Sequence, residues 1–519
     1  MFNYCRRVAI LFLGLFFILA FLCPAAIATE DIRSEVASII KNNYVDPVPA
    51  EVLAAPTIEE MLKRLGDPYA SYLSQEDYQE QLDALDGHFT GVGIYLIMES
   101  DGVHVLSVIK NSPADKAGLK KDDVIIGADG VSFRGMDSDQ AMELLRGPEG
   151  STVVLNIKRG AQMLTVNIVR EKVEVPTVHT EILDEGTAYL IIDDFGQRTA
   201  GELAQMVQDL QNRGINKWIV DLRGNPGGYL DSAIDVAGIF MGEQPVVLVE
   251  ERDIVESYIA SPSKVLAEGQ VIILQDEYSA SAAEILAAAL RDNMRALLIG
   301  ETTYGKGTVQ QIFPLSNGDK LKLTIARFYS PAGEEINGIG VKPDIDVEEE
   351  NIMAAAELLL SDNQDMVNGD MINLELDYFS VSVDYSSLRQ PRYWQAWADI
   401  IDGIGDAPVY YGNKSGWTKL SDKEREHKWS YYYPGYEHIG NYRNSLSPEG
   451  FCIYMAAGLD RDMVNNAELV NSVSGERINL TLEPLNKNML GCYLQQSLEA
   501  GEYWLVMHKQ GIIATIFKG

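Results

Sequence analysis

Three short stretches between residues 221 and 310 carry residue types that could do hydrolytic chemistry. They are RGNPGG from Arg223, SASAAE from Ser279 and GETTYGKGT from Gly300. A serine becomes a nucleophile when a base takes its proton, a neutral lysine can be that base, and glycine-rich backbone offers N–H groups to an oxyanion. Together these residue types could carry out acyl transfer, provided that the fold brings the three stretches to one place.

The stretch from Gly300 to Thr308 also partly matches a phosphate-binding loop. Four residues separate Gly300 from the Gly305-Lys306 pair, and an apolar ALLI precedes them. Such loops need Ser or Thr directly after the lysine and then a helix. This chain has Gly307 there, followed by TVQQIFPL, whose β-branched and aromatic residues predict a strand. The pattern argues against a nucleotide site and leaves Lys306 available for another role.

The elements that must position these residues alternate between strands and helices from Thr187 to about Glu350. Such alternation favours βαβ units and a mainly parallel sheet. The three stretches follow the predicted strands KWIVDL, QVIILQD and ALLIG. Because loops that follow parallel strands gather at one edge of a sheet, we expect Ser281, Lys306 and the glycine-rich backbone to meet there.

Ser281 precedes a predicted helix, whose free amides and positive dipole end would favour an oxyanion beside it. The usual base is histidine, but His179 is the only histidine between residues 175 and 350, and we expect it on a connecting strand before the sheet. Lys306 is then the candidate base, if burial keeps it neutral. Two structural alternatives remain open. SAAE from Ser281 to Glu284 fits a capping box, and RGNPGG fits a plain tight turn.

Residues 1–28 are predicted to be a secretory signal peptide. They contain two arginines, an apolar run and the small-residue cleavage pattern AIA. An uncleaved membrane anchor is the alternative. Export would leave Cys452 and Cys492, which could form one disulfide or remain two separate buried thiols.

Residues 30–85 carry apolar side chains at helical spacing and are predicted to form a helical region. From 86 to 172 short alternating strands follow, and FTGVGIYL with SPADKAGLKKDDVIIGADG resembles a PDZ domain. In that family a loop before the second strand presents backbone N–H groups to a peptide's terminal carboxylate, and the peptide adds as an edge strand. A plain tight turn is the alternative use of the loop's glycines. The matching loop here is Gly91, Val92, Gly93 and Ile94.

The C-terminal part differs from the rest. Residues 351–372 are acidic and contain methionines, which favours a linker, and residues 373–519 are predicted to form a separate β-rich domain. Five of the six tryptophans lie in this domain. Aromatic residues form the core of small β domains more often than a carbohydrate or peptide platform, so we expect core positions for them.

DLRGNPGG, SASAAEILAAAL and GETTYGKGTVQ, preceded by a PDZ domain, resemble the carboxyl-terminal processing, or tail-specific, peptidases. The resemblance extends from about residue 35 to 347 and keeps the order and spacing of the motifs. It implies a multidomain α/β protein, with a ClpP/crotonase-like protease core at 173–350 and an inserted PDZ domain.

The resemblance also implies roles for individual residues. The nucleophile is the second serine of SAS, here Ser281 and not Ser279, and the base is Lys306 of GKG. Gln310 would help to position this lysine. The implied oxyanion hole consists of the backbone N–H groups of Gly227 and Ala282.

The function predicted from these observations is that of an exported serine endopeptidase that recognises apolar C-terminal tails and requires no cofactor, metal or nucleotide. Activation by a partner protein is left open. The formal net charge of −34 argues against nucleic acid and anionic membranes as partners, because phosphates would be repelled. Two alternatives are a non-catalytic PDZ scaffold and a protein whose C-terminal domain binds a cell-wall or peptide ligand.

Overall fold

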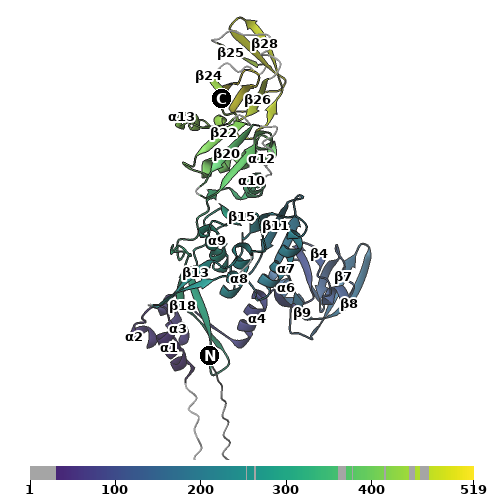
Figure 1. Ribbon diagram of the computed structural model, residues 1–519. Coiled ribbons are helices and arrows are strands. Elements are labelled where there is room, and N and C mark those ends of the chain that lie inside the picture. Colours follow the sequence, from purple (N-terminus) through teal and green to yellow (C-terminus); the bar gives the residue numbers. More distant parts are fainter. Residues whose placement is uncertain are drawn as a thin grey trace, which may run out of the picture.

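A computed structural model describes residues 31–518, except 253, 262–264, 361–369, 377, 414–415, 444–449 and 456–466. Figure 1 shows an elongated molecule, with an α/β body in the middle, a β-domain to one side and the C-terminal sheets at the far end. No helix in the described part is long and apolar enough to cross a membrane. The predicted signal peptide, residues 1–28, lies outside the described residues.

The centre of the body is a six-stranded sheet in the order β10-β11-β12-β15-β16-β19. All its strands are parallel except β10, which pairs antiparallel with β11 at the edge. The predicted parallel sheet is therefore confirmed. The inner strands are runs of buried apolar residues, because both faces of the sheet are covered. The strands are β10 (Val178–Ile182), β11 (Thr187–Ile192), β12 (Lys217–Asp221), β15 (Gln270–Gln275), β16 (Leu297–Gly300) and β19 (Ile345–Asp346).

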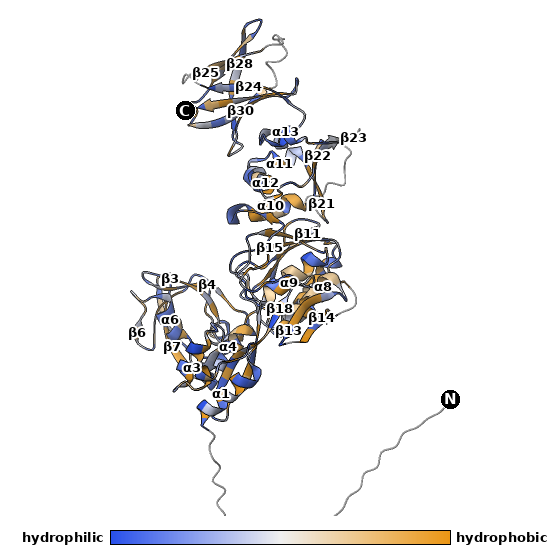
Figure 2. Ribbon diagram, turned by 90° about the vertical axis from the view of Figure 1, so that its left-hand side faces the viewer, coloured by the Kyte–Doolittle hydropathy of each residue, from blue (hydrophilic) through white to orange (hydrophobic). Residues whose placement is uncertain are grey.

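Three helices, α7 (Thr199–Gln211), α8 (Leu230–Met241) and α9 (Ala282–Asp292), share an apolar core with this sheet. Most residues of α8 and α9 are buried, and Figure 2 shows the hydrophobic colour of both helices. A helix that is apolar on every side needs neighbours all round. α9 has them in α8, β13 and β16, so its first turn, which follows Ser281, is held in place on several sides.

Other sheet residues pack against the region C-terminal to residue 350, where the sequence predicts a linker followed by a separate domain. Helices α10 (Ile352–Leu359) and α12 (Pro391–Gly403) share one apolar core with Ile272 and Leu297 of the sheet. Burial of apolar surface stabilises the fold by about 25 cal/mol per Å². A solvated linker would leave this surface in water and would not gain that free energy. The segment 351–372 thus begins with a packed helix, and part of the region after residue 372 shares its apolar core with the body.

A second sheet of the body carries the N-terminal helices. Its order is β1-β18-β13-β14, with β17 paired to β18. Val36 and Ile40 of α1 pack against Leu321 and Leu323 of β18. Figure 2 shows mixed hydrophilic and hydrophobic colour on α1 and α3, as expected for helices with one buried face. The elements are α1 (Ile32–Asn43), α2 (Ala50–Leu53), α3 (Ile58–Leu65), β1 (Ser71–Leu73), α4 (Gln75–Leu85), β13 (Pro245–Glu251), β14 (Ile254–Ile259), β17 (Thr308–Pro314) and β18 (Lys320–Tyr329).

The β-domain is inserted between α4 and β10. Its sheet has the order β3-β4-β5-β7-β8, with β6 paired to β5, and a separate pair, β2 with β9, adjoins it. Because β3 is an edge strand, its outer side is open to another strand. The elements are β2 (His88–Gly91), β3 (Ile94–Glu99), β4 (Gly102–Val108), α5 (Pro113–Lys116), β5 (Val124–Ala128), β6 (Val131–Ser132), α6 (Ser138–Leu145), β7 (Thr152–Arg159), β8 (Gln162–Val169) and β9 (Glu171–Glu174).

The described residues of the C-terminal region form three sheets. One has the order β21-β20-β22-β23, and the others have the orders β24-β31-β30-β26-β27 and β25-β29-β28. The β-rich prediction is confirmed, with α12 as an additional helical layer. The elements are η1 (Glu349–Asn351), β20 (Met371–Glu375), β21 (Ser380–Asp384), α11 (Tyr385–Leu388), β22 (Val409–Asn413), β23 (Gly416–Lys419), α13 (Asp422–Arg425), α14 (Trp429–Tyr432), β24 (Glu437–Arg443), β25 (Gly450–Tyr454), β26 (Ala467–Asn471), β27 (Arg477–Ile478), β28 (Leu480–Asn486), β29 (Met489–Leu494), β30 (Gly501–Met507) and β31 (Ile512–Lys518).

The tryptophans of this region are core residues, with one exception. Trp394, Trp397, Trp429 and Trp504 are at most 7% exposed, whereas Trp417 on β23 is 40% exposed. The two cysteines are free thiols, Cys452 exposed and Cys492 buried. The disulfide alternative is therefore wrong, and the alternative of two buried thiols holds for Cys492 alone.

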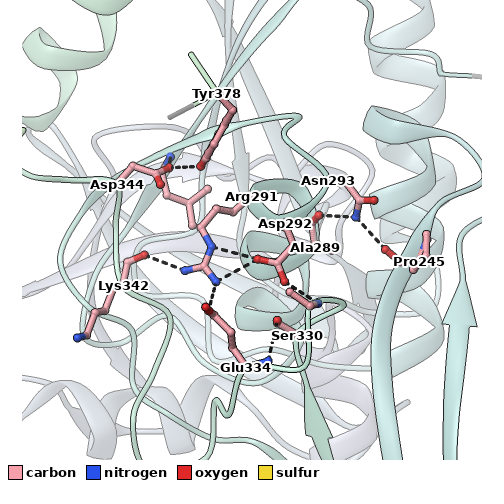
Figure 3. A network of polar contacts seen from close by, with 12 residues as sticks. Pro245, Ala289, Arg291, Asp292, Asn293, Ser330, Glu334, Lys342, Asp344 and Tyr378 are labelled. Atoms are coloured by element: carbon pink, nitrogen blue, oxygen red, sulfur yellow. Dashed lines mark hydrogen bonds and ion pairs between the residues drawn. The ribbon is translucent and has the colours of Figure 1, made fainter. Parts of the chain in front are cut away.

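A polar network also ties the C-terminal region to the body (Figure 3). The Tyr378 hydroxyl donates to Asp344 Oδ2 at 2.7 Å, and burial raises the pKa of Tyr378. At the end of α9, Arg291 pairs with Asp292 and with Glu334, at 3.1 and 2.6 Å. These contacts hold the C-terminal end of α9, whose N-terminal end follows Ser281.

Candidate active site

The three predicted loops meet, because they follow the neighbouring parallel strands β12, β15 and β16. Hydrogen bonds join the first two loops, since the Ala280 N–H donates to Asn225 O at 2.9 Å. The third loop is joined to the second by the Tyr304 N–H, which donates to Ser279 O at 3.0 Å. The juxtaposition expected from the sequence is therefore present.

Ser281 stands at the N-cap of α9 with an unusual backbone, φ 56° and ψ −112°. The predicted capping box with Glu284 is present. However, Ser74 and Ser112 cap their helices with φ of −62° and −69° and extended ψ. Capping therefore does not require positive φ, which strains a residue that has a Cβ. Such strain is concentrated at functional sites, so capping alone does not account for Ser281.

Ser279 is fully buried, and its hydroxyl is already used for structure. Its Oγ donates to Leu222 O at 2.8 Å and accepts from the Asp276 N–H at 3.0 Å. These bonds hold the loop after β15 against the loop after β12. The serine pair thus divides into a structural member, Ser279, and a member that lines a cleft, Ser281.

Lys306 lies between β16 and β17 and lines the same cleft as Ser281. Burial, followed by the nearby ammonium of Lys322, lowers the pKa of Lys306 below its ordinary value. Its Nζ lies 5.1 Å from the centre of the Tyr69 ring. Among the described residues, no hydrogen bond joins this Nζ to Ser281 Oγ. The strand β17 follows directly, which agrees with the rejection of a phosphate loop.

Glu284 joins the serine loop to the lysine loop. It is fully buried, and its Oε2 accepts from the N–H groups of Ser281 and Lys306, both at 2.8 Å. Its Oε1 accepts from the Gly305 N–H at 2.7 Å and from the Thr303 hydroxyl. Four donors on one carboxylate fix the two backbones relative to each other. The sequence predicts Glu284 only as a helix cap, and the S-x-x-E spacing is the signal for its wider role.

The two predicted oxyanion donors differ in their surroundings. Ala282 follows the serine, and its amide has no acceptor among the described residues. The Gly227 N–H, in contrast, donates to Asn225 Oδ1 at 2.8 Å. Gly228 lines the cleft beside it, and no acceptor for its amide occurs within the described chain. The predicted donor, the Gly227 N–H, is thus already bonded to the Asn225 side chain, whereas the Gly228 N–H is available to an oxyanion.

Gln310 lines the cleft from β17, as its predicted position near Lys306 requires. Its Nε2 donates to Thr308 Oγ1 at 2.9 Å. In the described chain it makes no hydrogen bond to Lys306.

The cleft has a volume of about 630 Å³, within the range of ligand sites. Sequence reasoning missed one of its walls, which comes from α4, the helix just before the β-domain. Tyr78, Leu82 and Leu85 of α4 line the cleft opposite residues from the body. His179 does not line this cleft. It lies on β10, which is an edge strand of the sheet and not a connecting strand before it, and its Nε2 pairs with Asp193 Oδ2 at 2.9 Å.

Comparisons with known proteins agree with this geometry. The model of peptidase family S41 matches residues 186–347, and the PDZ domain model matches residues 90–169. The carboxy-terminal processing protease CtpB of Bacillus subtilis is 33% identical over 354 residues, which cover 67% of this chain and 74% of that protein. This chain belongs to the S41 family of carboxy-terminal processing proteases.

Two further similar proteins cover nearly the same share of this chain. A probable CtpA-like serine protease of Staphylococcus haemolyticus is 36% identical over 325 residues, covering 61% of this chain and 65% of that one. The solved photosystem II D1 C-terminal processing protease has 26% identity and a TM-score of 0.42, covering 64% of this chain and 97% of that chain.

In this S41 peptidase the PDZ domain has an apolar groove of about 320 Å³ between β3 and α6. Val92 and Gly93 sit at its end, where the Val92 carbonyl accepts from the Ala114 N–H at 2.8 Å. Gly93 has φ 86°, and a Cβ there would stand 2.3 Å from Ser112 Cβ, so only glycine fits. The groove residues are Phe89, Gly91, Val92, Gly93, Ile94, Tyr95, Leu96, Ile109, Ser138, Met142, Leu145, Arg146 and Val175.

Replacing Gly227 with alanine is expected to reduce the peptidase rate at least about 100-fold, because positioning errors at a reacting centre are costly. A Cβ at Gly227 would lie 2.7 Å from Ser281 Cβ and 2.9 Å from the Ala282 nitrogen, at a φ of 108°. Gly224→Ala is the matched control, since Gly224 also has positive φ but nothing within 4 Å of a Cβ. It should lose about 1 kcal/mol of stability and little activity. Equal rates for the two variants would contradict the close contact with Ser281.

Proposed function

We propose that this S41 peptidase is an exported serine endopeptidase that captures protein C-terminal tails and cleaves peptide bonds with Ser281 as nucleophile and Lys306 as base. The observation that carries the proposal is a strained serine in one cleft with a lysine whose pKa is lowered by burial. Folding needs neither feature, because a cap works in relaxed backbone and a partly buried lysine ammonium destabilises the native state.

The proposed reaction uses only this chain's groups and water. Ser281 Oγ attacks the carbonyl carbon of the scissile peptide bond while Lys306 Nζ takes the hydroxyl proton. Backbone N–H groups of Ala282 and Gly228 hold the tetrahedral oxyanion, since the Gly227 N–H already donates to Asn225 Oδ1. The C–N bond then breaks, Lys306 gives its proton to the leaving amine, and an acyl-serine ester remains. Water then attacks the ester carbonyl carbon while Lys306 takes a proton from the water. The bond between this carbon and Ser281 Oγ breaks, Lys306 returns the proton to Oγ, and the peptide leaves with a new C-terminal carboxylate.

Lys306 has to approach Ser281 for the first step, since its Nζ rests near the Tyr69 ring. Catalytic hydrogen bonds are often absent or long in an empty enzyme and tighten when substrate binds. Gln310 can assist this approach. Its Nε2 is bonded to Thr308, so its Oε1 is the atom that can accept from Lys306.

The cleavage rate is expected to rise with pH and to level off below the ordinary lysine pKa of 10.5, because only neutral Lys306 can take a proton and its pKa is lowered. The same shift affects stability. The unfolded state binds this proton more tightly, so the native state is disfavoured below its own lysine pKa and regains stability as pH rises toward 10.5.

Lys306→Met separates these two effects. The variant should be inactive, yet at pH 7 it should melt at or above the wild-type temperature, because the buried ammonium is gone. The difference in melting temperature should shrink as pH rises. Lys322→Met is the matched control, since Lys322 also lines the cleft but is not proposed as the base. It should still cleave, with the rising limb of its pH profile moved to higher pH, because the ammonium that helps to lower the Lys306 pKa is lost. Retained cleavage by Lys306→Met would refute the role of the lysine.

The capture of C-terminal tails can be tested by changing the substrate, so that the enzyme stays wild type. An unfolded protein ending in small apolar residues should be cleaved at least about tenfold faster than the same protein with an amidated C-terminus, because amidation removes the carboxylate that the loop of Gly91, Val92, Gly93 and Ile94 is proposed to bind. Mass spectrometry of the products gives both the rates and the cleaved bonds. Equal rates for the two substrates would show that the PDZ groove does not bind the substrate carboxylate. They would not affect the proposed roles of Ser281 and Lys306.

Export is a separate part of the proposal. Removal of residues 1–28 would leave a mature chain that begins at Thr29, which N-terminal sequencing of the secreted protein can establish. A chain that keeps its N-terminus and stays with the membrane fraction would support the anchor instead.

A further inference from the structure

A second cleft lies far from the peptidase site, in the C-terminal region. It lies beside the hairpin of β22 and β23 and has a volume of about 530 Å³, the size of a small-ligand site. Its lining contains four aromatic side chains but no leucine, isoleucine, valine or methionine. The lining residues are Asp370, Tyr385, Arg389, Tyr411, Gly412, Gly416, Trp417, Thr418, Pro434 and Tyr436.

Trp417 is the exception among the tryptophans of this region, and it belongs to this cleft. Its side chain is 40% exposed, whereas the other four are buried. Gly412 stands opposite Trp417 across the hairpin, and a Cβ at Gly412 would lie only 3.0 Å from the indole ring. The glycine therefore lets the indole lie across β22. The exposed indole has no role in the core, which makes it available for a flat apolar ligand surface.

Tyr385 contributes a hydroxyl that the protein does not satisfy. The residue is 6% exposed, and its Oη has no hydrogen-bond partner among the described residues. The groups that act electrostatically on it are Arg389, Asp370 and Tyr411, and all three line the cleft. An unpartnered buried hydroxyl is costly, so a ligand that supplies a partner would be favoured.

Arg389 is held rigidly at the same cleft. Its guanidinium carbon lies 4.9 and 4.3 Å from the ring centres of Tyr385 and Tyr433, and its Nε donates to Tyr432 O at 2.8 Å. Its two terminal nitrogens have no hydrogen-bond partner within the described chain. Asp370 provides a carboxylate at the same cleft. The lining thus offers fixed donors and an acceptor, and among its described residues the one positive charge, Arg389, balances the one negative charge, Asp370.

We propose that this cleft binds a neutral glycan chain. A sugar ring has an apolar C–H face for the indole of Trp417 and hydroxyls that both donate and accept, which suits Arg389, Asp370 and the tyrosine hydroxyls. A peptide needs aliphatic pockets, which the PDZ groove has, and the described lining of this cleft contains no leucine, isoleucine, valine or methionine. The aliphatic residues of the PDZ groove include Val92, Ile94, Leu96, Met142 and Leu145. The inference does not depend on the peptidase mechanism.

Calorimetric titration of the purified full chain tests the proposal. The probes are the β-1,4-linked tetramers of N-acetylglucosamine and of glucose, which distinguish an acetylated from a plain glycan. We expect at least one tetramer to bind with a micromolar to millimolar Kd. If neither tetramer binds at millimolar concentrations, the proposal is overturned.

Three variants locate the binding. Trp417→Ala should weaken it at least about fivefold, because the stacking surface is lost. Tyr385→Phe keeps the ring and should weaken it about three- to tenfold, while the melting temperature stays equal or rises, because the lost hydroxyl has no partner in the free protein. Tyr454→Ala is the control, as Tyr454 is 60% exposed and does not line the cleft.

The outcomes separate the alternatives. Binding that survives Trp417→Ala would place the glycan elsewhere and overturn the proposal. Peptide binding that is lost in Trp417→Ala, with no tetramer binding, would make the cleft a peptide site and equally overturn it. A lower melting temperature of Tyr385→Phe would show that its hydroxyl serves the fold and not a ligand. Unchanged peptide cleavage in all three variants is expected, so failure here leaves the proposed peptidase intact.

Discussion

Ser281→Ala is expected to reduce kcat by roughly 10⁵- to 10⁶-fold, the size of effect that follows loss of a serine nucleophile. Its stability should fall by only about 1 kcal/mol, the usual contribution of a helix cap, since alanine keeps the same backbone strain. Cleavage of an unfolded protein with an apolar tail, measured beside a thermal melt, gives both quantities.

Ser279→Ala is the matched control for this prediction, because it removes a hydroxyl two residues away. Ser279 Oγ is bonded to Leu222 and Asp276, so its loss should lower stability by about 1–3 kcal/mol. The chemistry should be largely kept at temperatures where the variant is folded. The two variants therefore have opposite expected patterns. If Ser281→Ala melted lower and still cleaved, its capping role would be the whole role, and the nucleophile would be another residue.

Glu284→Gln is expected to lower both stability and activity strongly, because one carboxylate holds the loop of Ser281 and the loop of Lys306 together. Four donors reach its two oxygens, from Ser281, Lys306, Gly305 and Thr303. Glutamine has one acceptor oxygen and an NH₂ group that would face two of these donors. Loss of two charge-assisted bonds corresponds to about 3–6 kcal/mol of unfolding free energy. We expect kcat to fall at least about 100-fold, since the serine and lysine loops would separate.

Glu277→Gln is the control for this variant, being an exposed glutamate on the serine loop. It should change stability by less than about 0.5 kcal/mol and leave the rate unchanged. A pH profile distinguishes positioning from general destabilisation. If Glu284 places Lys306, the rising limb of the profile should shift in folded Glu284→Gln. A Glu284→Gln enzyme with wild-type rate and pH profile would limit this residue to capping α9.

The central features of the site are local and were therefore predictable. Strand and helix periodicity between residues 187 and 350 predicts the parallel sheet, and parallel strands leave their loops at one edge. The residues after GKG predict β17, which rejects the nucleotide interpretation of Lys306. Family membership then agrees with the resemblance in RGNPGG, SASAAE and GETTYGKGT.

Other features depend on contacts between distant segments, and patterns along the chain did not predict them. Tyr69 and α4 reach the cleft because β1 and α1 pack on β18. The Gly227 amide was predicted as an oxyanion donor, yet the side chain of Asn225 accepts from it. Residues 351–372 were predicted as a linker from their acidity, but the uncovered face of the sheet required an apolar partner, and α10 supplies it.

The sequence by itself determined which chemical groups this S41 peptidase has and the order in which its loops occur, because hydrophobic periodicity and glycine-rich motifs act over a few residues. Only the tertiary structure decided which of those groups are buried, strained or already bonded. Burial lowers the Lys306 pKa, and packing holds Ser281 at positive φ. Of the five tryptophans in the C-terminal region, Trp417 is the exposed one. Each of these properties depends on atoms that come together only when distant segments pack.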